Sequence, residues 1–180
     1  QLRGSGSILG DIQSGFIANV GLNIFNKYVI DSIEGKSKDK SSILETEIKL
    51  DCYWGSSIPK SYIDADSERI DIYKRLEHSE PNEVNEIKNE IIDRFGNTPE
   101  ITENLFSTAK IRSILRTKKI LRCKIKEFQL ELFPIDLTED LKLSVEKYDN
   151  KFIFRNKRLV LNFQHSLTPE STYELLDSIL

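Results

Sequence analysis

The opening residues of the chain combine glycines with two side chains that could hydrogen-bond to a partner. Between Leu2 and Gly15, Arg3 and Gln13 are the only long hydrogen-bonding side chains. Glycine costs conformational entropy wherever its freedom is unused, so a cluster favours positive φ angles or a close approach to another molecule. The glycines of this segment are Gly4, Gly6, Gly10 and Gly15.

Two simpler interpretations of this segment exist. A flexible terminus is one, but Ile8, Leu9 and Ile12 form a short apolar face that a linker lacks. A dinucleotide-binding loop of the form G-x-G-x-x-G is the other. It is disfavoured because the third glycine comes one position late and no strand precedes it.

A charged helix face is the second candidate for binding. Ser79 as cap, Pro81 in the first turn and Gly96 as stop predict a helix between them. At 100° per residue, five charged side chains fall within an arc of about 100° opposite the apolar stripe, where they could meet one flat partner. These are Glu83, Glu86, Glu90, Asp93 and Arg94. The alternative is a solvated face with a weak Glu90–Arg94 pair.

A basic run is the third candidate. From Ser107 to Lys126 the chain has eight cations and no acid. Such a run could neutralise phosphates, which makes a nucleic-acid-binding module the alternative function. Cations also belong at helix C-termini for dipole reasons, and no aromatic residue interleaves the run. The cations are Lys110, Arg112, Arg116, Lys118, Lys119, Arg122, Lys124 and Lys126.

Catalysis and metal binding are not expected in this chain. Cys52 and Cys123 have no neighbouring cysteine or histidine, so a metal-ligand spacing is absent. His78 and His165 are interpreted as solvated. The sequence has no G-x-S-x-G, G-x-x-x-x-G-K-[ST] or H-E-x-x-H motif. We therefore expect neither a catalytic residue nor a cofactor.

Composition places the chain among ordinary soluble globular proteins. It has 180 residues, 38% hydrophobic and 31% charged, with a net charge of −3, which argues against a protein that coats duplex DNA. We expect a cytoplasmic location, since two thiols suit a reducing compartment and no segment is long enough to span a membrane. The start at Gln1 and the lack of Met suggest a piece of a larger polypeptide.

Periodicity predicts an α+β domain in which a helical layer packs on a mostly antiparallel sheet. The glycine-rich loop at the start of the chain, followed by a linker helix and loop at residues 17–44, precedes this domain, which we place at 45–180. One strand is expected within Thr46–Tyr53, one or two within Cys123–Leu132, and a hairpin over Phe152–Phe163. Helices are expected from Asp66 to His78, from Ser79 to Gly96, from Thr98 onward and from Thr168 to Leu180.

Several motifs together resemble the bacterial transcription-repair coupling factor family. Leu2–Gly15, as L-R-G-S-G-x-x-x-G-x-x-Q-x-G, is similar to the end of the translocation motif that the family shares with RecG-type motors. Asn19–Phe25 resembles the family's linker into its C-terminal domain, and Arg69–Arg75 and Glu86–Gly96 resemble that domain. The resemblance covers roughly residues 1–120 and assigns 1–16 to the tail of the motor lobe.

The resemblance implies a function for the parent protein. It would be a bacterial ATP-dependent DNA translocase that binds ATP, magnesium and double-stranded DNA, displaces stalled RNA polymerase and recruits UvrA. Arg3 and Gln13 would couple the motor lobes to DNA. The element E-x-x-D-R, here Glu90–Arg94, would let a non-catalytic C-terminal domain clamp onto the UvrA-recruiting N-terminal module of the same chain.

Overall fold

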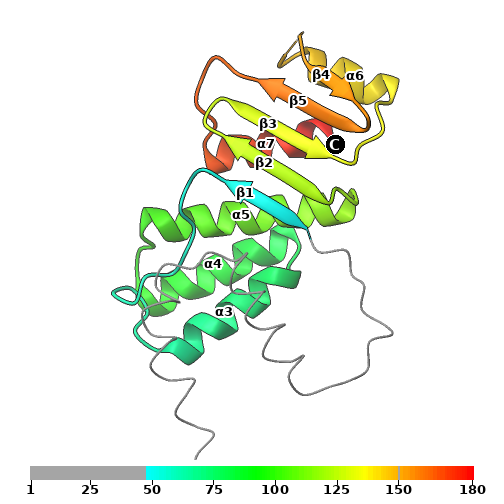
Figure 1. Cartoon of the computed structure of the whole chain (residues 1–180). Coiled ribbons are helices and arrows are strands. Elements are labelled where there is room, and N and C mark those ends of the chain that lie inside the picture. The colour runs from blue at the N-terminus through cyan, green and yellow to red at the C-terminus, as the bar shows by residue number, and fades with distance from the viewer. Residues whose placement is uncertain (1–47, 150) are drawn as a thin grey trace, which may run out of the picture.

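The computed structural model describes residues 48–149 and 151–180. The predicted glycine-rich loop and the linker helix at 17–44 lie outside these residues. Figure 1 shows the element order. The strands are β1 (Lys49–Cys52), β2 (Arg122–Lys126), β3 (Gln129–Phe133), β4 (Ile153–Arg155) and β5 (Arg158–Asn162). The helices are α3 (Asp66–His78), α4 (Pro81–Phe95), α5 (Glu100–Thr117), α6 (Glu139–Glu146) and α7 (Pro169–Ile179).

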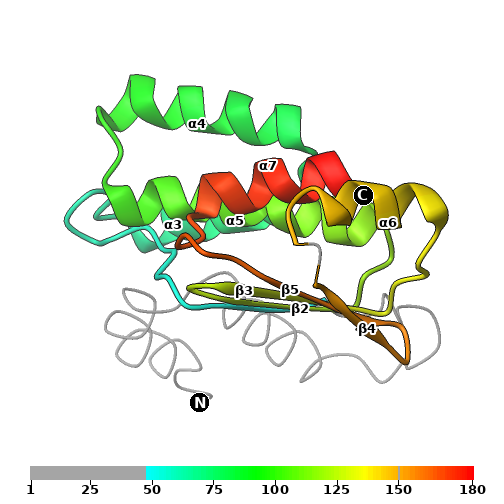
Figure 2. The same cartoon turned by 90° about the horizontal axis from the view of Figure 1, so that it is seen from above.

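The strands form one five-stranded sheet in the order β1-β2-β3-β5-β4. β1 runs parallel to β2, and the other three pairs are antiparallel. Residues alternate between faces along each strand, so Leu50, Cys123, Leu132 and Leu159 are buried on one face. Figure 2 shows the helices on that same side of the sheet. The predicted α+β fold, with helices packed on a mostly antiparallel sheet, is confirmed.

The β4–β5 hairpin turns at two residues with positive φ. Asn156 has φ 51° and Lys157 has φ 59°. Successive positive φ angles are those of the two-residue turn whose twist matches the twist of the flanking strands. The hairpin was predicted at this place from the alternation around Asn156 and Lys157.

Three consecutive helices follow β1, as predicted, and one capping detail differs. Ser79 was predicted to cap α4, but Glu80 occupies the N-cap position and forms a capping box with Glu83. The Ser79 hydroxyl instead donates to the Arg75 carbonyl at 2.7 Å. Glu80 can serve as the cap because its carboxylate accepts from the Glu83 backbone while the Glu83 side chain accepts from the Glu80 N–H.

Helix α5 joins two hydrophobic cores. Its first half, with Leu105 and Phe106, packs in a core formed with α3, α4 and the segment around Ile58 and Ile63. Its second half, with Ile111 and Leu115, packs against the sheet together with α6 and α7. Buried residues occur on nearly all sides of α5, and they include polar ones such as Ser107, Arg112 and Ser113.

One fully buried charge lies in the helical core. The Arg69 side chain is 0% exposed and its Nη1 donates to the Ile63 carbonyl at 2.6 Å and to the Asp64 carbonyl at 3.0 Å. Its Nη2 contacts the Asp66 carboxylate. Ile70, the next residue of α3, is only half-buried. Through these hydrogen bonds, Arg69 holds the segment of Ile63 and Asp64 against the start of α3.

Candidate functional site

Helix α4 presents the charged residues singled out in the sequence. Proline in the first turn and the capping box fix its start, and Gly96 ends it with φ 81°. Val84, Ile87 and Ile91 are buried beneath it. All five predicted charges, from Glu83 to Arg94, therefore lie on one regular helix, although they do not share one environment.

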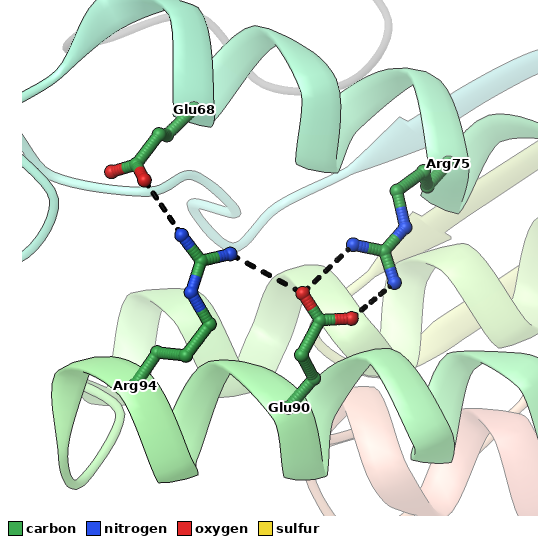
Figure 3. A network of polar contacts seen from close by, with 4 residues as sticks. All are labelled: Glu68, Arg75, Glu90 and Arg94. Atoms are coloured by element: carbon green, nitrogen blue, oxygen red, sulfur yellow. Dashed lines mark hydrogen bonds and ion pairs between the residues drawn. The ribbon is translucent and has the colours of Figure 1, made fainter.

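Two of the five charges belong to a network with helix α3, which Figure 3 shows. Arg75 donates two hydrogen bonds to the Glu90 carboxylate, from Nη1 to Oε1 at 3.1 Å and from Nη2 to Oε2 at 2.5 Å. Arg94 donates to Glu90 Oε1 at 3.3 Å and to Glu68 Oε1 at 2.6 Å. Fork-to-carboxylate pairs of this kind fix orientation as well as charge. The network holds the Glu90 and Arg94 side chains against α3.

The position of these two residues corrects the sequence analysis. The charged arc was predicted opposite the apolar stripe, whereas Glu90 and Arg94 lie beside the stripe and face α3. The reason is angular: Arg94 follows Ile91 by three residues, which leaves their side chains about 60° apart around the helix. Glu86 and Asp93 are exposed, and Glu83 is exposed with its carboxylate bound to the Glu80 N–H.

The network fixes the positions of these side chains but contributes little to the free energy of unfolding. Side-chain exposures are 37% for Arg75, 38% for Glu90, 47% for Arg94 and 39% for Glu68. Ion pairs this exposed contribute at most about 1 kcal/mol each. Hydrogen bonds from Arg75 are the main reason that the pKa of Glu90 lies below its usual value, and the same bonds raise the pKa of Arg75.

Arg75→Gln is expected to raise the pKa of Glu90 toward its ordinary value, because the first cause of the depression is removed. A carboxyl NMR titration of Glu90 measures it. A depressed pKa stabilises the fold at pH above the unfolded-state value, and this stabilisation is lost as pH falls through the folded-state pKa. The stability difference between wild type and variant should therefore shrink on acidification. Lys74→Gln, on the exposed side of α3, is the control, and an unchanged Glu90 titration in Arg75→Gln would contradict the network.

The basic run does not form one surface. Arg112 is 6% exposed and pairs with Glu77, and Arg116 donates to the Glu77 carbonyl at 2.7 Å. Lys110 lies over the Tyr173 ring. These cations hold helices together. The three on β2, Arg122, Lys124 and Lys126, are exposed on the sheet face that points away from the helices.

The cysteines and histidines among residues 48–149 and 151–180 do not form a catalytic site. Burial raises the pKa of Cys52 to about 12 and that of Cys123 well above its usual value, so both thiols are protonated at neutral pH. His78 and His165 are exposed. The described part of the chain has no group of three metal-binding side chains, and no helix in it is long and apolar enough to cross a membrane.

The residues assigned to motor coupling lie outside the described part of the chain. They are Arg3, Gly4, Gly6, Gly10, Gln13 and Gly15. Their roles stay predictions.

Sequence reasoning missed two partners in the α4 network. Glu68 and Arg75 lie on a different helix, and the Arg75–Glu90 contact joins residues 15 positions apart. Arg75 ends the stretch from Arg69 that carried the family resemblance, which was the available signal. No local spacing rule pairs residues on separate helices.

One protein-family model matches the part of the chain that contains α3 and α4. A model of the TRCF domain family matches residues 54–147, just over half of the chain. The chain belongs to the TRCF domain family. The matched TRCF region includes α3, α4 and α5 in full, and so all members of the Glu68–Arg75–Glu90–Arg94 network.

The curated relatives are much longer than this chain. The transcription-repair-coupling factor of Bacillus subtilis is 34% identical over 120 residues, which are 66% of this chain and 10% of that protein. That of Buchnera aphidicola is 35% identical over 119 residues, 63% of this chain and 15% of that protein. The chain thus spans only about a tenth to a seventh of the length of these relatives.

A solved TRCF structure has the same fold. The crystal structure of the C-terminal domain of transcription-repair coupling factor matches with a TM-score of 0.61 and 20% identity. The match covers 76% of this chain and 93% of that one. The fold of residues 48–180 is therefore that of a TRCF C-terminal domain.

Proposed function

We propose that residues 45–180 form a non-catalytic regulatory domain of a transcription-repair coupling factor. In this proposal the parent protein is an ATP-dependent DNA translocase that displaces stalled RNA polymerase and recruits UvrA. The domain would hold the UvrA-recruiting N-terminal module of the same chain in a closed state until the motor engages polymerase. Membership of the TRCF family and the C-terminal-domain fold support this proposal.

The observation that supports a clamp is the set of positioned charged side chains on α4. Glu86 and Asp93 are exposed, while Glu90 and Arg94 are held in place by α3. A surface of positioned charges gives a polar interface of moderate strength that a competing partner can release, as an autoinhibitory contact requires. Pre-organisation by Arg75 and Glu68 would lower the ordering cost of binding.

The glycine-rich segment would connect this domain to the motor. Arg3 and Gln13 would couple movement of the motor lobes to stepping on double-stranded DNA, with close backbone approach at the glycines. ATP and magnesium would bind in the motor lobes of the parent protein.

Reversing the exposed charges on α4 tests the clamp. In the full-length parent protein, Glu86→Lys combined with Asp93→Lys should raise UvrA binding in the absence of polymerase several-fold, because the closed state loses its charge complementarity. A pull-down with purified UvrA measures the binding. Both residues are exposed, so the fold should tolerate the change.

The matched control reverses two acids on other helices. Glu146→Lys with Glu174→Lys changes the net charge equally, and both residues are exposed on α6 and α7. UvrA binding should stay at the wild-type level in this variant. Equal UvrA binding by the α4 variant and the wild type would refute the clamp on α4.

A further inference from the structure

One face of the sheet is open among the described residues. Figure 2 shows the helices gathered on a single side, with no described element on the other. Strand register places six cations on this open face: Lys49, Arg122, Lys124, Lys126, Arg155 and Arg158. All six are exposed. The face has just two acids, Asp51 and Glu131, so it carries four excess positive charges on a chain whose net charge is −3.

The acids compensate only the centre of this face. Lys124 has Asp51 beside it on β1 and Glu131 opposite it on β3. Glu131 also pairs with Arg158 at 3.3 Å. The cross-strand neighbours of Lys49, Arg122, Lys126 and Arg155 are not acidic, and two pairs are like-charged: Lys49 with Arg122, and Arg155 with Arg158.

Like charges on neighbouring strands repel and destabilise a sheet. A face that keeps two such pairs breaks a local folding rule, and of these four cations only Arg158 has an ion pair among the described residues, with Glu131. Violations of this kind are typical of functional surfaces. A partner that brings negative charge would relieve this repulsion.

We propose that the open sheet face binds the phosphate backbone of a nucleic acid, independently of base sequence. The cations extend over four of the five strands, from β1 to β4, a width of about 19 Å at the usual strand spacing. Along β2 they recur at every second residue, about 6.6 Å apart. A broad, flat array of this kind fits the closely and regularly spaced charges of a phosphate backbone.

Composition favours nucleic acid over an acidic protein. The core of a protein–protein interface is depleted of charge and rich in aromatic and other apolar side chains, whereas nucleic-acid interfaces are strongly cationic. Phe133, Ile153 and Val160 are the apolar side chains that the described register puts on this face, among six cations. Three of the eight cations of the basic run contact other helices, whereas the cations of this face are brought together by the folded sheet.

The proposal is tested by binding of the 180-residue chain to a labelled, mixed-sequence DNA duplex at several salt concentrations. Fluorescence anisotropy between about 50 and 200 mM salt should show the logarithm of the affinity falling linearly with the logarithm of the salt concentration. Removing three cations by Arg122→Gln, Lys126→Gln and Arg155→Gln should weaken binding about tenfold or more at the lowest salt. It should also reduce the slope by about 0.9 for each lost phosphate contact.

The matched control removes the same charge elsewhere. Lys60→Gln, Lys74→Gln and Lys147→Gln change exposed cations that lie outside the sheet, and should leave the salt slope unchanged. Absence of duplex binding at the lowest salt, or equal weakening by both triple variants, would overturn the proposal. Tighter binding to poly-glutamate than to DNA, lost in the sheet variant, would overturn it in favour of an acidic protein partner. Circular dichroism of both variants verifies that the fold is retained.

Discussion

Arg69→Ala should lower the free energy of unfolding by about 4 kcal/mol, one of the two largest effects expected in this chain. The guanidinium is fully buried and donates to the carbonyls of Ile63 and Asp64 and to the Asp66 carboxylate. Truncation leaves two backbone acceptors without their charged donor and a cavity where the side chain was. Denaturant titration followed by circular dichroism measures the loss.

A second substitution separates the two causes. Arg69→Met fills most of the volume but supplies no donor, so it should cost about 2 kcal/mol, the part due to hydrogen bonding. Arg69 Nε has no hydrogen-bond partner among the described residues, which keeps that part moderate. Lys74→Ala, exposed on the same helix, is the control and should change stability by less than about 0.5 kcal/mol. If Arg69→Met is as stable as the wild type, the hydrogen bonds are not what holds the segment before α3.

Local signals predicted the helices that have clear ends. The first of them, Asp66–His78, has the predicted bounds, and Gly96 ends α4 as expected. Such ends depend on neighbouring residues alone: acids in the first turn, proline at its start and glycine at its stop. The turn at Asn156 and Lys157 was found for the same reason.

Helix α6 was missed because its signal is weak. It has eight residues, and Leu141 and Val145 are its buried residues. Two apolar residues at a spacing of four do not establish a helical period. Thr138, whose side chain accepts from the Leu141 N–H, was the available start signal.

The features that carry the functional proposals could not be predicted from local sequence. The contact between Arg75 and Glu90 depends on how α3 packs beside α4, and the cation array depends on the pairing of all five strands. The burial of Arg69, on a helix rich in charges, follows from carbonyls that a preceding segment brings to it. Each is a tertiary contact: the helical period can place Glu90 and Arg94 near the apolar stripe, but it cannot say which helix packs there.

The other large effect tests whether the two cores unfold together. Phe106→Ala in the helical core and Leu130→Ala in the sheet core should each cost about 3 to 5 kcal/mol, since both side chains are almost fully buried. Helix α5 contributes to both cores, so damage to one removes support from the other. We expect each variant to keep a single unfolding transition.

Two probes report on that transition. Trp54 is the one tryptophan in the sequence, and its Nε1 donates to Thr108 Oγ1 on α5 at 3.2 Å, close to the place where the helix passes from one core to the other. Its fluorescence and the circular dichroism of the helices should change at the same denaturant concentration. In Phe106→Ala, an early loss of helical signal with unchanged Trp54 fluorescence would mean that the helical core melts alone. Coincident transitions would mean that α5 couples the α4 surface to the sheet, so that the clamp and the cation array belong to one cooperative unit.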